Sequence, residues 1–227
     1  MNFLKAKDYK KHAKVQNFMA LKLCLELKNL KQKHFKRVFE FGCARGEFSQ
    51  ELQKIISFDE YVKNDILDYG TDGVQIFDMN ELAKQDLSKE KFDLIVSNAT
   101  LQWLDLKRIL PTLVNMLNEK GILLLSTFAE QNLKEIKQST GFSLNYFDIC
   151  ALEQIFKVYF NEIKITQEFL ELSFDNALEV FRHLKLSGVN SLGFYPLNKQ
   201  FLKDFEEKFQ NKLTYHPVFI LCKNDIK

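Results

Sequence analysis

The sequence predicts an α/β protein built on a doubly wound, mostly parallel sheet. Short apolar runs of strand length alternate along the chain with segments that can form helices, which is the pattern of parallel strands joined by crossovers. The first of these runs, within residues 38–47 (VFEFGCARGE), enters a glycine turn. Apolar residues then recur at helical spacing over 48–56, so Gly42 and Gly46 are expected where the chain reverses and a ligand can approach the backbone. An ordinary strand-to-helix turn would show the same pattern.

The expected elements follow the hydrophobic periodicity in chain order. A helix is predicted over 12–30, where one stripe is apolar and lysines lie on the other side. Strands are predicted at 37–41, 60–64, 74–77, 92–97 and 122–128, the last apolar enough to be buried on both faces. Further helices are predicted at 106–117, 133–138, 148–159 and 176–186, and strand-like stretches at 162–174 and 213–222. Pro217 lies inside the final stretch and argues for an edge strand or a bulge there.

Composition favours one soluble globular domain of 227 residues. Basic and acidic residues number 32 and 30, and this near balance argues against a large nucleic-acid footprint. The four cysteines have no spacing typical of a zinc site or a disulfide framework, and no metal site is predicted. No apolar run is long enough to span a bilayer, and lysines interrupt the first residues where a signal peptide needs an apolar stretch. A cytoplasmic location without a membrane partner is the default expectation.

Charge is distributed unevenly along the chain. Eleven Lys and Arg residues fall within residues 1–37, against Asp8 and Glu26. Such a run is most often a solvated helix face, but it can also be a docking surface for an acidic partner.

Ligands of an open parallel sheet bind beyond the carboxyl ends of the strands, near the point where strand order reverses. Besides the glycine turn, three predicted strand ends offer polar groups there. Asp65 follows the second strand and could accept hydrogen bonds from a ribose diol. Asp78 and Met79 follow the third, where a carboxylate could take an exocyclic amine and a thioether could lie against a purine. A surface turn would explain an isolated aspartate equally well.

The fourth strand end carries the segment SNATLQW at 97–103. Asn98 and Gln102 would direct their amides toward a ligand, and Trp103, the only tryptophan of the chain, could form a wall of the site. Core packing is an equally good interpretation of Trp103.

The glycine turn also discriminates between cofactors. A dinucleotide fingerprint needs G-x-G-x-x-G, so that the backbone can reach a pyrophosphate at a helix N-terminus. Here the turn reads GCARG and Glu47 opens the helix, where its carboxylate would repel a pyrophosphate. An acidic strand end at Glu40 suits a cationic ligand instead. S-adenosylmethionine carries an ammonium and a sulfonium and no phosphate, so a nicotinamide-dependent dehydrogenase is the weaker alternative.

With these residues in view, the chain resembles class I S-adenosylmethionine-dependent methyltransferases, whose first motif is E/D-x-G-x-G-x-G. Glu40, Gly42 and Gly46 match the motif, whereas Ala44 replaces its middle glycine. The added methyl group could shift the cofactor slightly. This resemblance covers about residues 37–128.

A narrower resemblance, to the malonyl-acyl-carrier-protein O-methyltransferases of biotin synthesis, extends over nearly the whole chain. Four segments carry it: YKKHAKVQ at 9–16, FDLIVSNATLQW at 92–103, LSTF at 125–128 with NLKEI at 132–136, and RHLKLSGVN at 182–190, where Ser187 stands for a threonine. It implies a Rossmann-like, seven-stranded sheet with an antiparallel edge strand, plus an N-terminal helix and a small helical lid. The implied single methyltransferase domain divides into a cap helix (1–36), a cofactor-binding core (37–128) and a lid with C-terminal strands (129–227).

The resemblance also implies roles for individual residues. Tyr9 would hydrogen-bond the reacting carboxylate, and Arg182 would clamp it as a bidentate partner. Asp65 would take the ribose of S-adenosylmethionine. The other residues expected to bind the cofactor are Glu40, Gly42, Ala44, Gly46, Asp78, Met79 and Asn98. The other residues expected to bind the substrate are His12, Gln102, Trp103, His183 and Lys185.

The implied substrate is a malonyl thioester on acyl carrier protein, whose acidic surface would give the lysine-rich N-terminal region a docking role. A malonyl carboxylate is ionised at neutral pH, so methyl transfer to it needs neither a strong base nor a metal. Two alternatives stay open: a methyltransferase acting on another small carboxylic acid or other small molecule, and a non-catalytic binding protein that keeps the fold.

Overall fold

The computed structural model describes residues 13–187 and 197–224. The chain divides into two compact units. The sheet unit comprises Gln16–Thr127, Phe147–Gln167 and Val218–Lys227, and the small unit comprises Met1–Val15, Phe128–Tyr146 and Glu168–Pro217. The interpretation of the chain as a single domain stays a prediction.

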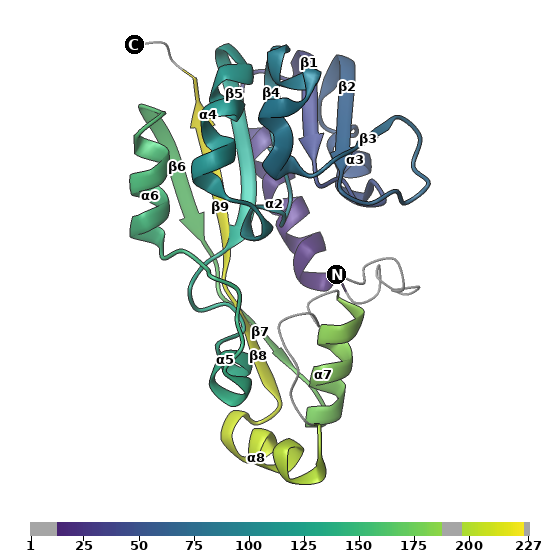
Figure 1. The fold of residues 1–227 in the computed structure, drawn as a ribbon, viewed down its shortest axis with the longest axis vertical. Coiled ribbons are helices and arrows are strands. Elements are labelled where there is room, and N and C mark those ends of the chain that lie inside the picture. Colours follow the sequence, from purple (N-terminus) through teal and green to yellow (C-terminus); the bar gives the residue numbers. More distant parts are fainter. Residues whose placement is uncertain (1–12, 188–196, 225–227) are drawn as a thin grey trace. The chain divides into compact units, whose positions relative to one another are not determined.

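The sheet unit is built on the predicted mostly parallel sheet, which the structure confirms. Over the described ranges it has seven strands in the order β3-β2-β1-β4-β5-β9-β6. Figure 1 shows β1, β2 and β3 toward one side and β6 at the other. Strand β1 pairs in parallel with both β2 and β4. Strands β2 and β3 are also parallel, and so are β4 and β5. The edge strand β6 is antiparallel to β9. The strands are β1 (His34–Phe41), β2 (Ser57–Asp65), β3 (Val74–Ile76), β4 (Phe92–Ser97), β5 (Leu117–Phe128), β6 (Glu162–Gln167) and β9 (Pro217–Lys223).

Helices flank the sheet because the chain winds in opposite directions from its centre. The connection from β1 to β2 carries α3 (Glu47–Leu52) and that from β4 to β5 carries α4 (Leu106–Met116), and right-handed crossovers put such helices on opposite faces. The other helices are α2 (Lys14–Asn29) and α6 (Ile149–Lys157), with the 3-10 turns η2 (Met79–Lys84), η3 (Asp86–Lys89) and η4 (Leu101–Trp103). Met19, Leu23 and Leu27 of α2 are completely buried, as the predicted apolar stripe requires. None of the described helices is long and apolar enough to cross a membrane.

The small unit pairs β7 (Leu170–Ser173) with β8 (Lys212–Tyr215) in an antiparallel ladder. Its helices are α5 (Lys134–Thr140), α7 (Ala177–Leu186) and α8 (Lys199–Phe209). Phe181 of α7 packs against Phe201 and Phe205 of α8 with ring centroids 5.5 and 5.2 Å apart. Sequence periodicity did not identify α8, although Asn198 caps it and phenylalanines recur along it at a spacing of four.

Three details of the tail differ from expectation. The stretch 162–174 forms two strands, β6 and β7, in different sheets. The stretch 213–222 is divided between β8 and β9. Pro217 is the first residue of β9, which lies between β5 and β6, so the edge-strand interpretation was wrong. Proline is tolerated at the start of a strand, where its missing N–H breaks no ladder.

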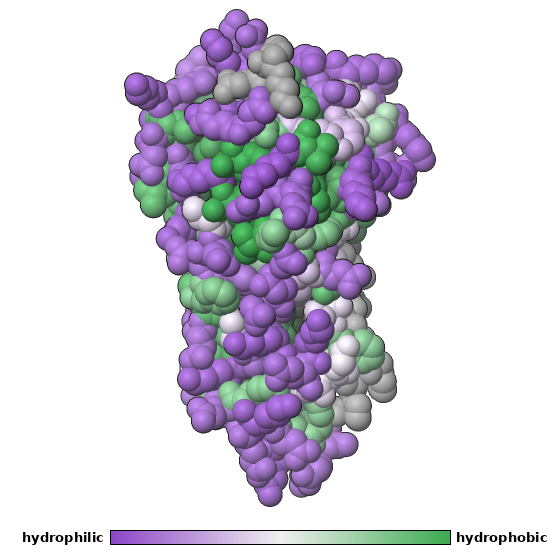
Figure 2. Space-filling view, turned by 90° about the vertical axis from the view of Figure 1, so that its left-hand side faces the viewer, coloured by the Kyte–Doolittle hydropathy of each residue, from purple (hydrophilic) through white to green (hydrophobic). Residues whose placement is uncertain are grey.

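Strand β6, which forms the edge of the sheet next to β9, carries charges on exposed positions. Glu162 pairs with Lys223 on the neighbouring strand, and Lys164 pairs with Glu26 of α2 at 2.7 Å. Figure 2 shows the side of the molecule that bears α6 and β6, where apolar surface is interspersed with polar side chains. Charged residues on an edge strand hinder its pairing with another chain.

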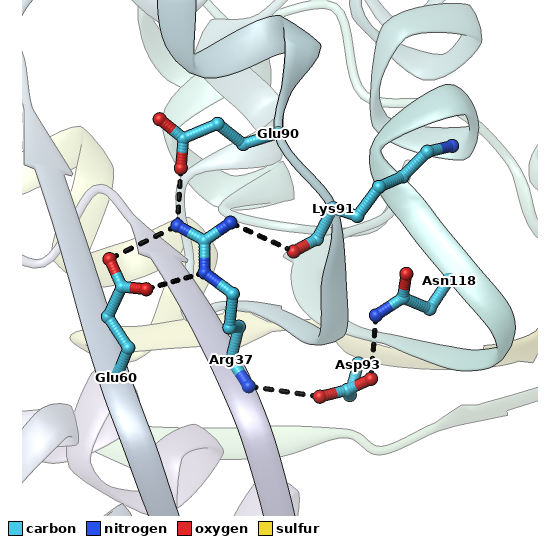
Figure 3. Close-up of polar contacts among 6 residues, drawn as sticks. All are labelled: Arg37, Glu60, Glu90, Lys91, Asp93 and Asn118. Carbon is cyan, nitrogen blue, oxygen red and sulfur yellow. Dashed lines mark hydrogen bonds and ion pairs between the residues drawn. The ribbon is translucent and has the colours of Figure 1, made fainter.

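An arginine network joins three strands near their amino ends (Figure 3). The Arg37 guanidinium donates from Nε to Glu60 at 2.5 Å and from Nη1 to the Lys91 carbonyl at 3.2 Å, and it also pairs with Glu90. It lies 4.7 Å from the centre of the Phe92 ring. The hydrogen bond to Glu60 raises the pKa of Arg37 and lowers the pKa of Glu60.

Asp93 extends this network to the fifth strand. Its carboxylate accepts from the Arg37 backbone N–H at 2.9 Å and from Asn118 Nδ2 at 2.7 Å. The network thus connects β1, β2, β4 and β5 at the edge opposite the glycine turn, where a structural role is expected.

We expect Arg37→Met to lower the free energy of unfolding by about 1 kcal/mol, because the half-exposed carboxylates of Glu60 and Glu90 lose the cation that they share. Urea unfolding measures the change. Lys157→Met is the matched control. Among the described residues Lys157 pairs only with Glu153, on the surface of α6, and its loss should change little. Equal effects of the two substitutions would contradict a network role for Arg37.

Candidate functional site

The glycine turn after β1 has three residues in the left-handed region. Gly42, Ala44 and Gly46 have φ of 68°, 47° and 81°. A Cβ on Gly46 would meet only Ser49 Oγ, at 3.7 Å, so this part of the turn is open. Ala44 is strained by about 1–2 kcal/mol because its Cβ is crowded in this conformation.

Gly42 is required for a different reason. A Cβ there would lie 2.1 Å from Thr100 Oγ1 and 2.9 Å from Thr100 Cβ. The missing side chain therefore makes room for the segment that follows β4. Sequence reasoning connected Gly42 with ligand approach and missed Thr100, because the two residues are far apart in the chain.

Glu40, the acidic residue at the end of β1, is buried. Its Oε2 accepts hydrogen bonds from Ser49 Oγ and, at 2.6 Å, from Tyr61 Oη. Burial raises the pKa of Glu40 to about 7, although both hydrogen bonds act in the opposite direction. Burial and the nearby Glu40 charge raise the pKa of Tyr61, which keeps the phenol protonated as a donor.

Asp65, at the end of β2, connects the glycine turn to the loop that follows β2. Its Oδ2 accepts from the Ala44 N–H at 2.8 Å and its Oδ1 from the Leu67 N–H at 3.0 Å. Burial raises the pKa of Asp65. Each carboxylate oxygen keeps a second lone pair, so hydroxyl groups of a ligand can still bind.

Asn64 holds the neighbouring strand end. Its Nδ2 donates to the carbonyls of Gln75 and Phe77 at 3.0 Å each. Its backbone carbonyl accepts from the Cys43 N–H at 3.1 Å. The carboxyl ends of β1, β2 and β3 are therefore joined through the side chain and the backbone carbonyl of Asn64.

Asp78 and Met79 follow β3 as expected. Asp78 caps η2, since its Oδ1 accepts from the Asn80 N–H at 2.9 Å, and Met79 is buried. Their assignment to an adenine stays a prediction.

The polar segment after β4 is engaged within the sheet unit. Asn98 Oδ1 accepts from Ser126 Oγ at 2.7 Å, and its Nδ2 donates to the Gln16 carbonyl at 3.0 Å. Gln102 donates to the Ala99 carbonyl at 2.6 Å. Asn98 thus ties the ends of β4 and β5 to the first turn of α2. The roles of both amides toward cofactor and substrate stay predictions. Trp103, which ends η4, is half-buried.

Comparison with known proteins identifies the family. A family model described as "Methyltransferase domain" matches residues 11–169. The chain is 33% identical over 234 residues to malonyl-[acyl-carrier protein] O-methyltransferase of Calditerrivibrio nitroreducens, covering 98% of this chain and 95% of that protein. The protein with the same name from Acinetobacter baylyi is 33% identical over 247 residues, which cover 97% and 94% of the two chains. The chain belongs to the malonyl-[acyl-carrier protein] O-methyltransferase family.

Solved structures agree with the fold of this methyltransferase. The YcgJ protein of Bacillus subtilis superposes with a TM-score of 0.65 at 12% identity and covers 90% of this chain and 98% of its own. An S-adenosylmethionine-dependent methyltransferase from Archaeoglobus fulgidus gives a TM-score of 0.54 at 17% identity, with 92% and 94% covered.

The residues around the glycine turn fit the methyltransferase cofactor, S-adenosylmethionine. Over the described part of the chain, Glu47 Oε1 is buried without a hydrogen-bond partner, and Glu40 lies at the other end of the turn. Unpaired buried carboxylate oxygen suits a ligand that carries an ammonium and a sulfonium. The acidic groups at the turn are therefore opposite in charge to the cationic groups of this cofactor.

The predicted substrate residues of the methyltransferase that are described on α7 lie in the small unit. Arg182 is exposed and donates to Glu179 at 2.6 Å, and Lys185 is exposed. His183 is buried, and its Nε2 lies 2.9 Å from Tyr215 Oη. Tyr9 and His12 lie outside the described residues, so their predicted roles stay predictions.

Part of the lysine-rich N-terminal region has a structural role. Lys33 Nζ donates to the carbonyls of Leu27 and Leu30 at 2.8 and 2.6 Å and so caps the end of α2. Lys33 and Arg37 lie before and within the first half of β1, whereas the glycine turn follows its carboxyl end. These two cations therefore lie away from the end of β1 that carries the glycine turn.

Proposed function

We propose that this methyltransferase transfers the methyl group of S-adenosylmethionine to the free carboxylate of a malonyl thioester on acyl carrier protein. The product would be the methyl ester that enters pimeloyl and biotin synthesis. The observation that carries the proposal is the match to relatives of that name over almost the full length of both chains. The acidic glycine turn supports it independently, because it suits a cationic methyl donor.

The residues around the glycine turn would hold and orient the cofactor. When bound, S-adenosylmethionine supplies an electrophilic methyl group on its sulfonium. Glu40 and Glu47 would face its cationic methionine end, and Asp65 would accept from the ribose hydroxyls. The backbone at Gly46 leaves room for close approach.

The substrate needs alignment more than activation. Its carboxylate is already ionised near neutral pH, so no residue has to remove a proton from it. Rate enhancement would come from holding the attacking oxygen in line with the methyl group and from excluding water. Arg182 would clamp the carboxylate, since its hydrogen bond to Glu179 uses only one guanidinium nitrogen. Tyr9 would fix the orientation of that carboxylate.

His183 and Lys185 would act beside Arg182 on the same helix. The contact between His183 and Tyr215 would hold α7 in place, and the exposed Lys185 would meet acidic surface of the carrier protein. His12, Gln102 and Trp103 would complete the acyl pocket. The proposed location of the reaction is the cytoplasm.

The direct test incubates the purified full-length chain with labelled S-adenosylmethionine and malonyl-, succinyl- or acetyl-carrier protein. We expect mass spectrometry to find a methyl ester on the malonyl form, and none on the acetyl form, which lacks a free carboxylate. Arg182→Gln should raise KM for malonyl-carrier protein about tenfold or more, because a bidentate pair is lost. Arg108→Gln, at another exposed arginine paired with a glutamate, is the control.

Two results would contradict the proposal. If none of the three carrier proteins were methylated, the family and the fold would still stand, but the proposed substrate would be wrong. Equal methylation of malonyl and succinyl forms would point to a less selective carboxyl methyltransferase.

A further inference from the structure

The connection between β2 and β3 is unusually short. Parallel neighbouring strands generally need a crossover of a dozen or more residues, most often a helix. Here only residues 66–73 connect them, and they form no helix. The connection fits because β3 is brief and Val74 pairs with Lys63, close to the end of β2. This loop, called loop 66–73 below, lies directly after Asp65.

Loop 66–73 is held at both of its ends. The Leu67 N–H donates to Asp65 Oδ1 at 3.0 Å, and Lys63 Nζ donates to the Asp72 carbonyl at 2.8 Å. Between these points the Gly70 N–H donates to Asp68 Oδ1 at 2.7 Å, which closes a local turn. These contacts fix the two ends of the loop and one turn within it.

A fourth contact joins the middle of the loop to the glycine turn. The guanidinium carbon of Arg45 lies 5.5 Å from the centre of the Tyr69 ring, within the range of a cation–π interaction. Arg45 lies between Ala44, whose N–H donates to Asp65 Oδ2, and the open Gly46. One carboxylate oxygen of Asp65 therefore accepts a hydrogen bond from the glycine turn, and the other accepts one from loop 66–73. The contact between Arg45 and Tyr69 joins the same two segments.

We propose that Arg45 and Tyr69 are a positioning pair that holds loop 66–73 against the glycine turn and thereby fixes Asp65 to receive the ribose of S-adenosylmethionine. The inference rests on the ribose role of Asp65 in the proposed function. Without the pair, the loop could separate from the turn and the ligand would have to reorder it on binding. The sequence motif contains neither side chain as a signature residue, which is why sequence reasoning passed over both.

The test measures binding of S-adenosylmethionine, S-adenosylhomocysteine and adenosine by calorimetry, independently of any methyl acceptor. We expect Tyr69→Ala to weaken all three about three- to tenfold, since a cation–π contact and the loop order that depends on it are lost. Tyr69→Phe keeps the ring beside Arg45 and should lose less affinity than Tyr69→Ala does. In a double-mutant cycle, Arg45→Ala should add little to Tyr69→Ala, because each removes the same contact.

Controls separate this inference from the function on which it rests. Tyr159→Ala, at an exposed tyrosine after α6, should leave all three affinities unchanged. Asp65→Asn tests the role of Asp65 while it keeps the contact between Arg45 and Tyr69: unaltered adenosine binding there would overturn the ribose assignment. If Asp65→Asn weakens adenosine binding but Tyr69→Ala does not, or if the Arg45 and Tyr69 effects multiply, the positioning pair is wrong while the proposed function stands.

Discussion

We expect Gly42→Ala to lower the free energy of unfolding of the sheet unit by about 3 kcal/mol, from backbone strain and overpacking together. The new Cβ would lie 2.1–2.9 Å from three atoms of Thr100, and the residue would keep a φ of 68°. Because even Thr100 Cβ is among those atoms, a change of side-chain rotamer cannot remove the clash. Urea unfolding followed by the fluorescence of Trp103, which lies in the sheet unit, measures the loss.

Gly73→Ala is the matched control for this prediction. Gly73 has a φ of 70° in the same unit, but no atom lies within 4 Å of a Cβ built there. It should therefore report backbone strain alone. In the double variant Gly42→Ala/Thr100→Gly, the steric part of the loss should be recovered and the strain should remain. Equal losses for Gly42→Ala and Gly73→Ala would show that Thr100 does not make Gly42 necessary.

The local pattern of the sequence predicted the elements that are set by local forces. The predicted strand at 92–97 has the bounds of β4, and the glycine turn lies between β1 and α3 as expected. These features depend on hydrophobic periodicity and on residues that permit positive φ, both of which are visible in a short window.

The partners of site residues could not be predicted in this way. Tyr61 reaches Glu40 because β1 and β2 are neighbours in one particular register, and Ser126 reaches Asn98 because β4 and β5 are. The register of two paired strands depends on residues that are far apart in the chain, so it cannot be predicted from a short stretch of one sequence. Ser49 is the exception, since it lies in the first turn of the helix after the glycine turn and could have been found from its position alone.

The location of the loop between β2 and β3 also could not be predicted from the sequence. The eight residues 66–73 include two aspartates and two glycines, which is typical of a turn, but only the parallel pairing of β3 with β2 makes that turn a neighbour of the ligand site. Its contact with Arg45 follows from topology. Residues of this kind are recognised only when the sheet order is known.

The second large effect concerns Glu40. A carboxyl whose pKa is raised from 4.5 to about 7 in the folded protein binds its proton more tightly there than in the unfolded chain. Its contribution to stability is therefore fully present below pH 4.5 and is lost as the pH rises toward 7. Above pH 7 the buried carboxylate destabilises the fold by as much as about 3 kcal/mol relative to a neutral group.

We expect Glu40→Gln to be more stable than the natural protein at pH 8 and nearly equal to it at pH 5. The amide oxygen can still accept from Ser49 and Tyr61, so the packing is kept while the charge is removed. Urea unfolding at both pH values measures this difference. Glu119→Gln, at an exposed position, should change stability little at either pH. A difference between Glu40→Gln and the natural protein that is independent of pH would show that Glu40 does not titrate in this range.

The same substitution should weaken binding of S-adenosylmethionine about tenfold or more at pH 8, because a cationic ligand loses its buried counter-charge. In the natural protein the affinity should itself fall about tenfold from pH 8 to pH 6, since Glu40 must release a proton before it can pair with the ligand. In Glu40→Gln this pH dependence should disappear. A gain in stability joined to a loss of affinity would mean that the chain keeps an unfavourable buried carboxylate because the cofactor needs its charge; unchanged affinity would remove Glu40 from the cofactor site.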